Sequence, residues 1–144
     1  MSKRPVSVLA VIHTPALDVL MLERASHPGY WQSVTGSQED DEPLIATAKR
    51  EVAEETGIVC PADAFEDWRL SNRFEIFAEW RHRYAPGVTH NTEHVFGLKL
   101  PAPLPVTLSQ HEHLNYVWLP WEEAAERCFS PSNAAAIRQL PKRL

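Results

Sequence analysis

The chain has 144 residues, 44% hydrophobic and 23% charged, which is ordinary for one globular domain spanning residues 1–144. The formal net charge of −5 and the lack of any Lys or Arg run disfavour nucleic acid as a partner, because phosphate contacts need a basic face. The chain has only two cysteines, Cys60 and Cys128, which are expected to be buried free thiols. It shows no signal-peptide pattern and no stretch of membrane-spanning length, so we expect a cytoplasmic location and no membrane partner.

Two strands are predicted near the N-terminus. Residues 5–13 and 19–24 are rich in β-branched residues and are separated by a TPALD turn. The first segment is almost continuously apolar, which predicts a central strand covered on both faces. Turn residues surround an aromatic pair in the segment HPGYWQSVTGS that follows, residues 27–37.

A helix is predicted after this segment. Asp40 to Pro43 provide residue types typical of a helix N-cap and first turn, and Gly57 suits the left-handed residue that ends a helix. At helical spacing, one face is apolar and is formed by Leu44, Ile45, Ala48 and Val52.

The second half of the chain predicts more strands and two helices. Residues 74–84 alternate apolar and polar side chains and predict a strand, with a turn at 85–87 and an antiparallel return at 93–100. A short extended connector at 101–105 leads to a strand at 114–120 and to helices at 121–128 and 132–140. Ser132 or Asn133 is expected to cap the second helix. This order predicts an α+β fold, a mixed β-sheet with helices on its faces.

Three acidic residues occupy an unfavourable place at the end of the first helix. Carboxylates near a helix C-terminus are disfavoured by roughly 0.3–1 kcal/mol each. Glu54 can pair with Arg50, whereas Glu51 and Glu55 fall at the edge of the apolar face and point toward the body of the protein. Two partly desolvated carboxylates require a proton or a cation, and Mg²⁺ suits ligands that are all carboxylate oxygens.

The same stretch resembles the Nudix box at every fixed position and spacing. Gly36 is followed after five residues by Glu42, and after seven more by the run REVAEETGI of residues 50–58. The resemblance implies the Nudix fold, a mixed β-sheet sandwiched between α-helices. It also implies cleavage of a nucleoside diphosphate linked to another moiety, by metal-assisted attack of water on phosphorus.

Roles for the box residues also follow from the resemblance. Glu51 and Glu55 would be the main Mg²⁺ ligands, with Mn²⁺ able to substitute. Glu54 would bind a further ion or position water, and Glu112, in a loop before a strand, would be a ligand or the general base. Arg50 would orient the carboxylates. Glu42 would brace the loop before the helix, where Asp41 replaces a common glycine.

The flanking segments resemble one branch of the family along nearly the whole chain. They are KRPVSVL, VLMLER, WQSVTGS, FEIF, RHRYAPGV, NTE and EHLNYVWL. The resemblance implies removal of pyrophosphate from 7,8-dihydroneopterin triphosphate, an early step of folate synthesis, with no obligate protein partner. Relatives that hydrolyse dATP suggest a house-cleaning nucleoside triphosphate pyrophosphatase as the alternative. A non-catalytic nucleotide sensor is disfavoured by the intact box, and an RNA-processing enzyme by the acidic charge.

Three residues match substrate-binding positions of that branch. Lys3 and Arg24 offer charge to a triphosphate and Thr35 offers a hydroxyl, although Lys3 could equally belong to a frayed terminus. Ser132 is a further candidate, with helix capping as its other explanation.

Aromatic and histidine side chains complete the candidates. Trp31, Phe74 and Tyr84 could stack on a pterin, but core packing is the expectation for each. His111 and His113 are expected in a surface loop, since neighbouring His-x-His side chains diverge unless a third ligand helps.

Overall fold

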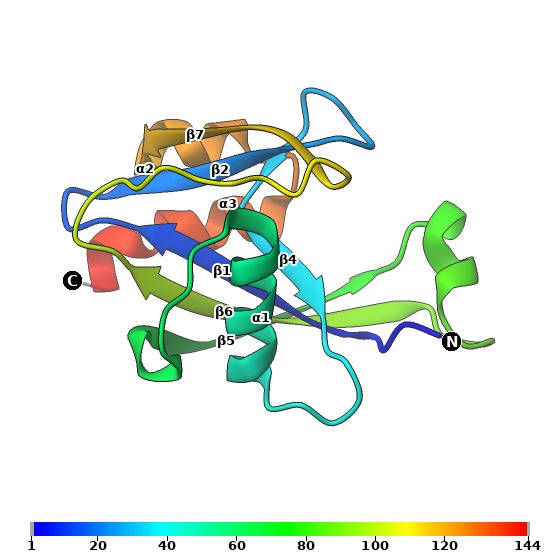
Figure 1. Ribbon diagram of the computed structural model, residues 1–144. Coiled ribbons are helices and arrows are strands. Elements are labelled where there is room, and N and C mark those ends of the chain that lie inside the picture. Colours follow the sequence, from blue (N-terminus) through cyan, green and yellow to red (C-terminus); the bar gives the residue numbers. More distant parts are fainter. Residues whose placement is uncertain (1, 144) are drawn as a thin grey trace.

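The computed structural model describes residues 2–143, which build a seven-stranded mixed sheet (Figure 1). Five strands cross the sheet in the order β3-β2-β1-β6-β5, while β4 pairs with β1 and β7 with β2. The strands are β1 (Val6–His13), β2 (Asp18–Arg24), β3 (Trp31–Gln32), β4 (Val34–Ser37), β5 (Phe65–Glu75), β6 (His90–Lys99) and β7 (His113–Pro120).

Strand β1 is central, as its apolar run predicts. It pairs in parallel with β6 and antiparallel with β2 and β4. Residues Val8 to Ile12 are each no more than 1% exposed. Because side chains alternate along a strand, Leu9 and Val11 belong to one hydrophobic cluster, and Val8, Ala10 and Ile12 to the other.

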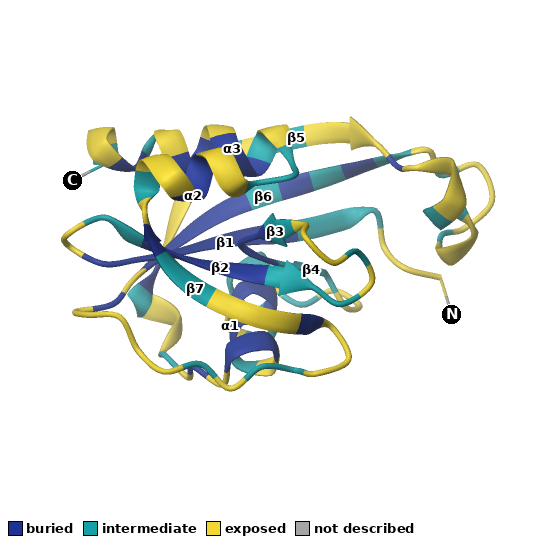
Figure 2. Ribbon diagram, turned by 90° about the horizontal axis from the view of Figure 1, so that it is seen from above, coloured by how far each residue is buried: buried dark blue, intermediate teal, exposed yellow. Residues whose placement is uncertain are grey.

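Helices cover both faces of this sheet. Helix α1 (Leu44–Thr56) packs Ala48 and Val52 into the cluster that contains Val8. Helices α2 (Trp121–Arg127) and α3 (Pro131–Arg138) pack into the cluster that contains Leu9. Figure 2 shows the buried strands lying between these two layers. The predicted α+β fold with a mixed sheet between helices is confirmed.

The ends of α1 are formed differently from each other. Gly57 has a φ of 74° and donates its N–H to Ala53, so the predicted left-handed terminus is confirmed. The N-cap, Pro43, falls within the predicted residues 40–43, but capping by a side chain is wrong, since no described side chain caps this end. The Glu42 carboxylate instead accepts the Glu39 N–H at 2.9 Å and binds Arg50.

The strand predicted at residues 74–84 is wrong. β5 ends at Glu75, and a 3₁₀ helix, η2 (Ala78–Arg83), follows. Phe77 packs edge-on against Trp80 with ring centroids 5.1 Å apart, and Arg81 Nε donates to the Ile76 carbonyl at 3.0 Å. These local contacts favour a turn over continued pairing. Strand β6 therefore returns antiparallel to residues 65–75, and η2 forms a lobe at one end of the sheet (Figure 1).

The remaining elements are short or as predicted. The short strands β3 and β4 lie within a segment predicted only as a turn, and η1 (Ala62–Ala64) and η3 (Leu140–Arg143) are further 3₁₀ helices. Cys60 and Cys128 are free, as predicted, but half-buried. Within residues 2–143, each helix is too short or too polar to span a bilayer.

Candidate active site

The acidic residues of α1 divide as the helical wheel predicts. The side chains of Glu51 and Glu55 are 12% and 3% exposed, whereas that of Glu54 is 56% exposed. Arg50 Nη1 lies 3.5 Å from the Glu54 carboxylate, so this pair forms as expected. Glu51 and Glu55 thus face a cleft about 1090 Å³ in volume that Glu54 also lines.

Arg50 holds the carboxylates around it in place. Its guanidinium donates to Glu42 Oε1 at 2.6 Å, to Glu51 Oε1 at 2.7 Å and to the Ser37 carbonyl at 2.9 Å. The hydrogen bonds from Arg50 lower the pKa of Glu42 to about 2. The arrangement agrees with an orienting role for Arg50 and a bracing role for Glu42, whose carbonyl also accepts from Gln38.

Asp41 has no part in this network. Its side chain is 99% exposed and lies 3.6 Å from Arg4. The backbone of the neighbouring Asp40 takes the left-handed conformation, with a φ of 48°. The replacement of glycine by Asp41 therefore leaves the carboxylate cluster untouched.

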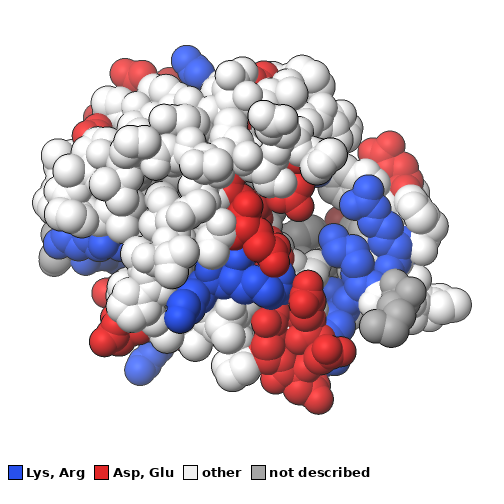
Figure 3. All heavy atoms as spheres, in the orientation of Figure 1, with Lys and Arg blue, Asp and Glu red and all other residues white. Residues whose placement is uncertain are grey.

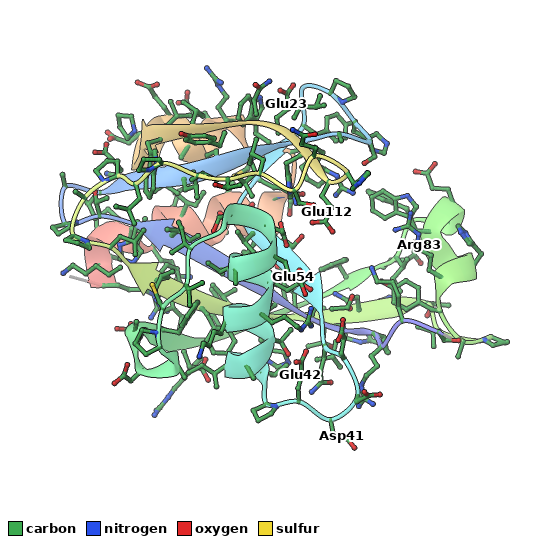
Figure 4. All side chains as sticks on the ribbon, viewed as in Figure 1. Glu23, Asp41, Glu42, Glu54, Arg83 and Glu112 are labelled. Atoms are coloured by element: carbon green, nitrogen blue, oxygen red, sulfur yellow. The ribbon has the colours of Figure 1, made fainter. Side chains whose placement is uncertain are left out.

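Glu55 lies close to two residues at the start of β7. They are Glu112, in the loop before the strand, and His113, its first residue. Glu55, Glu112 and His113 each offer a ligand atom, and these atoms lie within 4.8 Å of one another. Glu112 is exposed in the loop before β7, where the sequence places it. Figure 4 shows Glu54 and Glu112 approaching the same gap from different elements, with Arg83 on its far side.

The prediction that His113 lies on the surface is wrong, while His111 is exposed as expected. His113 is 4% exposed, and its Nε2 lies 3.6 Å from Glu55 Oε1. Burial, and next the charge of Arg24, lower the pKa of His113 to about 4, so the ring is neutral near pH 7. His113 thus joins Glu55 and Glu112, whereas His111 is outside this group of possible ligands.

The buried carboxylates suit a divalent cation. Glu55 Oε1 is buried and receives no hydrogen bond from any residue between 2 and 143. Burial, and next the adjacent Glu51, raise the pKa of Glu55 well above its usual value, and burial also raises the pKa of Glu51. An unpaired acceptor beside a second desolvated carboxylate fits a hard cation with oxygen ligands.

Basic side chains lie across the cleft from these acids. Figure 3 shows acidic side chains gathered over α1 and its preceding loop, with basic ones beyond a hollow. The basic residues that line the cleft include Lys3, Arg24 and Arg83. This charge separation fits a polyphosphate held between a metal ion and protein cations.

Lys3 is held by the η2 lobe, so the frayed-terminus alternative is wrong. Its backbone N–H donates to the Arg83 carbonyl at 2.8 Å, and its ammonium lies 5.8 Å from the centroid of the Tyr84 ring. Burial, and next the charge of Arg83, lower the pKa of Lys3. Thr35 lies nearby through a relay in which Arg24 donates to Gln32 and Gln32 donates to Thr35.

A second cavity of about 330 Å³ adjoins the cleft, and Lys3, Arg24 and Thr35 line both. Its walls are aromatic and include Phe74, Trp80, Tyr84 and Phe129. The Arg24 guanidinium lies 5.3 Å from the Trp80 ring centroid and 5.6 Å from that of Phe129. Core packing, expected for Phe74 and Tyr84, is therefore wrong for these two.

Trp31 lies outside this cavity. It packs beside the cluster under α2 and α3, and Arg127 lies 5.7 Å from its ring centroid. For Trp31 the expectation of core packing is confirmed.

Ser132 lines the aromatic cavity from within α3. Its hydroxyl donates to Glu93 Oε1 at 3.2 Å. Capping by Ser132 or Asn133 is wrong, because Ser130 is the N-cap and accepts the Asn133 N–H at 3.4 Å. Asn133 instead accepts the Ser33 N–H at 2.8 Å.

Several residues that line the cavity were not predicted from the sequence. Among them, Trp80 and Arg83 belong to the η2 lobe, Asn91 and Glu93 to β6, and Phe129 to the turn before α3. The run RHRY held a detectable signal, since three basic residues in four are unusual in a strand predicted to pair with residues 93–100.

The fold and the site together define a class of enzyme. The NUDIX domain family matches residues 3–140, so the chain belongs to this family and is a Nudix hydrolase. Nudix hydrolases use divalent metal ions, and the group around Glu55 has the ligand types for one.

Particular members of the family are similar to this chain along almost its full length. The dihydroneopterin triphosphate diphosphatase of Escherichia coli (strain K12) is 47% identical over 96% of this chain and 93% of its own. The Haemophilus influenzae enzyme of the same name is 41% identical over 92% and 85%. The solved structure of the E. coli dihydroneopterin triphosphate pyrophosphohydrolase has a TM-score of 0.88, with 96% of both chains covered.

Proposed function

We propose that this chain hydrolyses 7,8-dihydroneopterin triphosphate to dihydroneopterin monophosphate and pyrophosphate, with Mg²⁺ as the ion. The observation that carries the proposal is the continuity of the acidic cleft with the aromatic cavity, through the shared residues Lys3, Arg24 and Thr35. A triphosphate can lie in the first while its ring lies in the second. The names of relatives that are 47% and 41% identical support the same substrate.

The acidic residues would hold the ion and the water. Glu51 and Glu55 would be its main ligands, and Glu112, whose carboxylate is near Glu55, a further ligand or the general base. Bound Mg²⁺ would neutralise charge on the phosphate oxygens and favour ionisation of water. Glu54 is exposed enough to position the attacking water or a further ion. Arg50 keeps Glu51 in one orientation before substrate arrives.

The opposite wall would position the phosphates. Lys3, Arg24 and Arg83 offer cationic donors in the cleft, and Thr35 offers a hydroxyl. Because burial lowers the pKa of Lys3, an incoming polyanion would favour its charged form. These contacts would align the reacting phosphorus with the water held by the acids.

The aromatic cavity would bind the pterin. A flat, two-ring heterocycle can stack on aromatic walls, and 330 Å³ lies within the usual size of small-molecule sites. Phe74 lies near the end of β5, Tyr84 directly after η2, and Phe129 in the turn before α3. Ser132 also lines this cavity and would act there through Glu93.

The test is a comparison of pyrophosphate release from dihydroneopterin triphosphate and from dATP, with Mg²⁺ or with EDTA. A higher kcat/KM for the pterin substrate, with activity lost in EDTA, would support the proposal. A clear preference for dATP would instead favour a house-cleaning nucleoside triphosphate pyrophosphatase. No release from either substrate with Mg²⁺ would point to a binding role.

A further inference from the structure

Asn91 and Glu93 are buried polar residues that line the same cavity as the aromatic side chains, and they are called its polar floor below. Both belong to β6 and are two residues apart, so their side chains project from the same face of the strand. They are 4% and 6% exposed, and both line the 330 Å³ cavity. Buried polar side chains in a ligand cavity need partners, and neither is fully supplied with them by the protein.

The unused groups on this floor are hydrogen-bond acceptors. Asn91 Nδ2 donates to Ser7 Oγ at 2.7 Å, which leaves Asn91 Oδ1 buried and without a donor among residues 2–143. Glu93 Oε1 accepts from Ser132 at 3.2 Å, and a carboxylate has about four lone-pair sites. The floor therefore suits a ligand edge that carries N–H donors.

The environment of Glu93 leaves it available to a ligand. Burial raises the pKa of Glu93, and the Ser132 hydroxyl and the Asn72 amide oppose that shift. Asn72 Nδ2 approaches without a regular hydrogen bond, and no described Lys, Arg or His forms an ion pair with Glu93. A buried carboxylate with so few partners is costly to the fold, which suggests a use in binding.

We infer that Glu93 accepts two parallel N–H donors from the 2-amino-4-oxopyrimidine edge of the pterin, and that Asn91 supports it as an adjacent acceptor. The inference rests on the proposed function and adds the residue that selects the ring. The 2-amino group and N3–H of a pterin match the two oxygens of a carboxylate. Adenine offers an amino donor beside an acceptor nitrogen, which would face Glu93 unpaired and weaken binding.

The decisive variant is Glu93→Gln, which keeps the shape of the side chain and can still accept from Ser132. A glutamine presents one acceptor and one donor, so it loses a pterin contact and gains a match to adenine. We expect kcat/KM for dihydroneopterin triphosphate to fall about 10- to 100-fold, the size of one hydrogen bond to a charged group. The value for dATP should change less than about threefold or rise, because its own contact is not lost.

Glu75→Gln is the matched control. Glu75 also lines the cavity, so this variant removes the same charge there, but the Glu75 side chain is 68% exposed and pairs with Arg81 at 3.4 Å. Its ratio of pterin to dATP activity should stay at the wild-type value. If Glu93→Gln also keeps that ratio, or loses both activities equally, Glu93 is a structural residue and the inference is wrong.

A ligand comparison decides the same question without any variant. Binding of pterin and lumazine to the wild-type protein would be measured in EDTA by quenching of ligand fluorescence; lumazine carries an oxo group in place of the 2-amino group. We expect pterin to bind about 10-fold more tightly, and equal affinities would overturn the inference. Should the wild-type protein release no pyrophosphate from the pterin substrate, the proposed function fails, yet this comparison still tests Glu93.

Discussion

The Glu51 carboxylate fills the space into which a Cβ on Gly36 would project. Strand β4 therefore lies directly against the acidic face of α1, at a distance that only glycine allows. Gly36 also lines both cavities, so the close approach occurs where the substrate would pass. The first glycine of the box is thus required by the position of a carboxylate fifteen residues further along the chain, about two helical turns into α1.

Gly36→Ala should displace Glu51 and lower kcat/KM by at least about 10-fold, because small misplacements of a metal ligand are costly. A double-mutant cycle with Glu51→Ala would check the cause through the free energy of unfolding in urea. Gly36→Ala should destabilise the wild-type background more than the Glu51→Ala background. An equal loss in both would mean that another contact explains the glycine.

Glu55→Gln should nearly abolish turnover while the protein stays folded. A neutral amide binds Mg²⁺ poorly, and Glu55 is the most buried of the three α1 carboxylates. The measurement is kcat at saturating Mg²⁺, with circular dichroism as the test of folding. Glu126→Gln on α2, an exposed Glu on the opposite face of the sheet, should keep wild-type turnover. Wild-type rates from folded Glu55→Gln would remove α1 from the mechanism.

Metal should reverse the stability order of these two proteins. Without metal, Glu55→Gln should melt at a higher temperature than the wild type, since a buried carboxylate beside Glu51 is replaced by a neutral group. Mg²⁺ should raise the melting temperature of the wild type more than that of the variant. At a concentration one hundred times its Kd, a bound ion adds roughly 2.7 kcal/mol to the free energy of unfolding. A thermal-shift titration against EDTA would test both. A variant that melts below the wild type in EDTA would contradict this account.

The parts of the site that lie within one element could be predicted from the sequence. Helical periodicity placed Glu51 and Glu55 inward and Glu54 outward, and the exposures of 12%, 3% and 56% agree. The strong apolar run likewise identified β1 as the central strand. Both patterns depend on a fixed geometry repeated over neighbouring residues, which a local argument can use.

The parts of the site that depend on tertiary contacts could not be predicted from the sequence. His113 is buried in the fold, where α1 brings Glu55 to within 3.6 Å of its ring. The η2 lobe arises because Phe77 and Trp80 pack on each other, which overrides the alternating pattern at residues 74–84. Glu93 looked like an ordinary strand residue, since its partner Ser132 lies 39 residues further along the chain.

Glu42→Gln should destabilise the protein by about 1–2 kcal/mol at pH 7, because the charged hydrogen bonds to Arg50 are lost. The folded-state pKa of about 2 lies below the ordinary 4.5, so the charged form stabilises the fold above pH 4.5 and that contribution is lost as pH falls toward 2. Urea unfolding of both proteins at several pH values should show a constant difference from pH 5 to 8 that shrinks below about 4.5.

Asp41→Asn is the matched control for that series. Asp41 is adjacent in sequence and pairs with Arg4 at 3.6 Å, but its side chain is 99% exposed. Its replacement should leave the free energy of unfolding almost unchanged at every pH. A difference between wild type and Glu42→Gln that does not depend on pH would indicate packing rather than charge as the role of Glu42.

Arg83→Gln should raise KM for the triphosphate substrate about 10-fold and leave kcat less affected, since Arg83 faces the acidic helix across the cleft (Figure 4) and would contact phosphate in substrate and transition state alike. Added salt should weaken the wild-type enzyme more than the variant, because one screened attraction is already missing. Arg73→Gln, at an exposed position on β5 outside both cavities, is the control for loss of a charge and should keep the wild-type KM. Equal KM values for the two variants would place the phosphates away from the η2 lobe and leave Lys3 and Arg24 as their cationic partners.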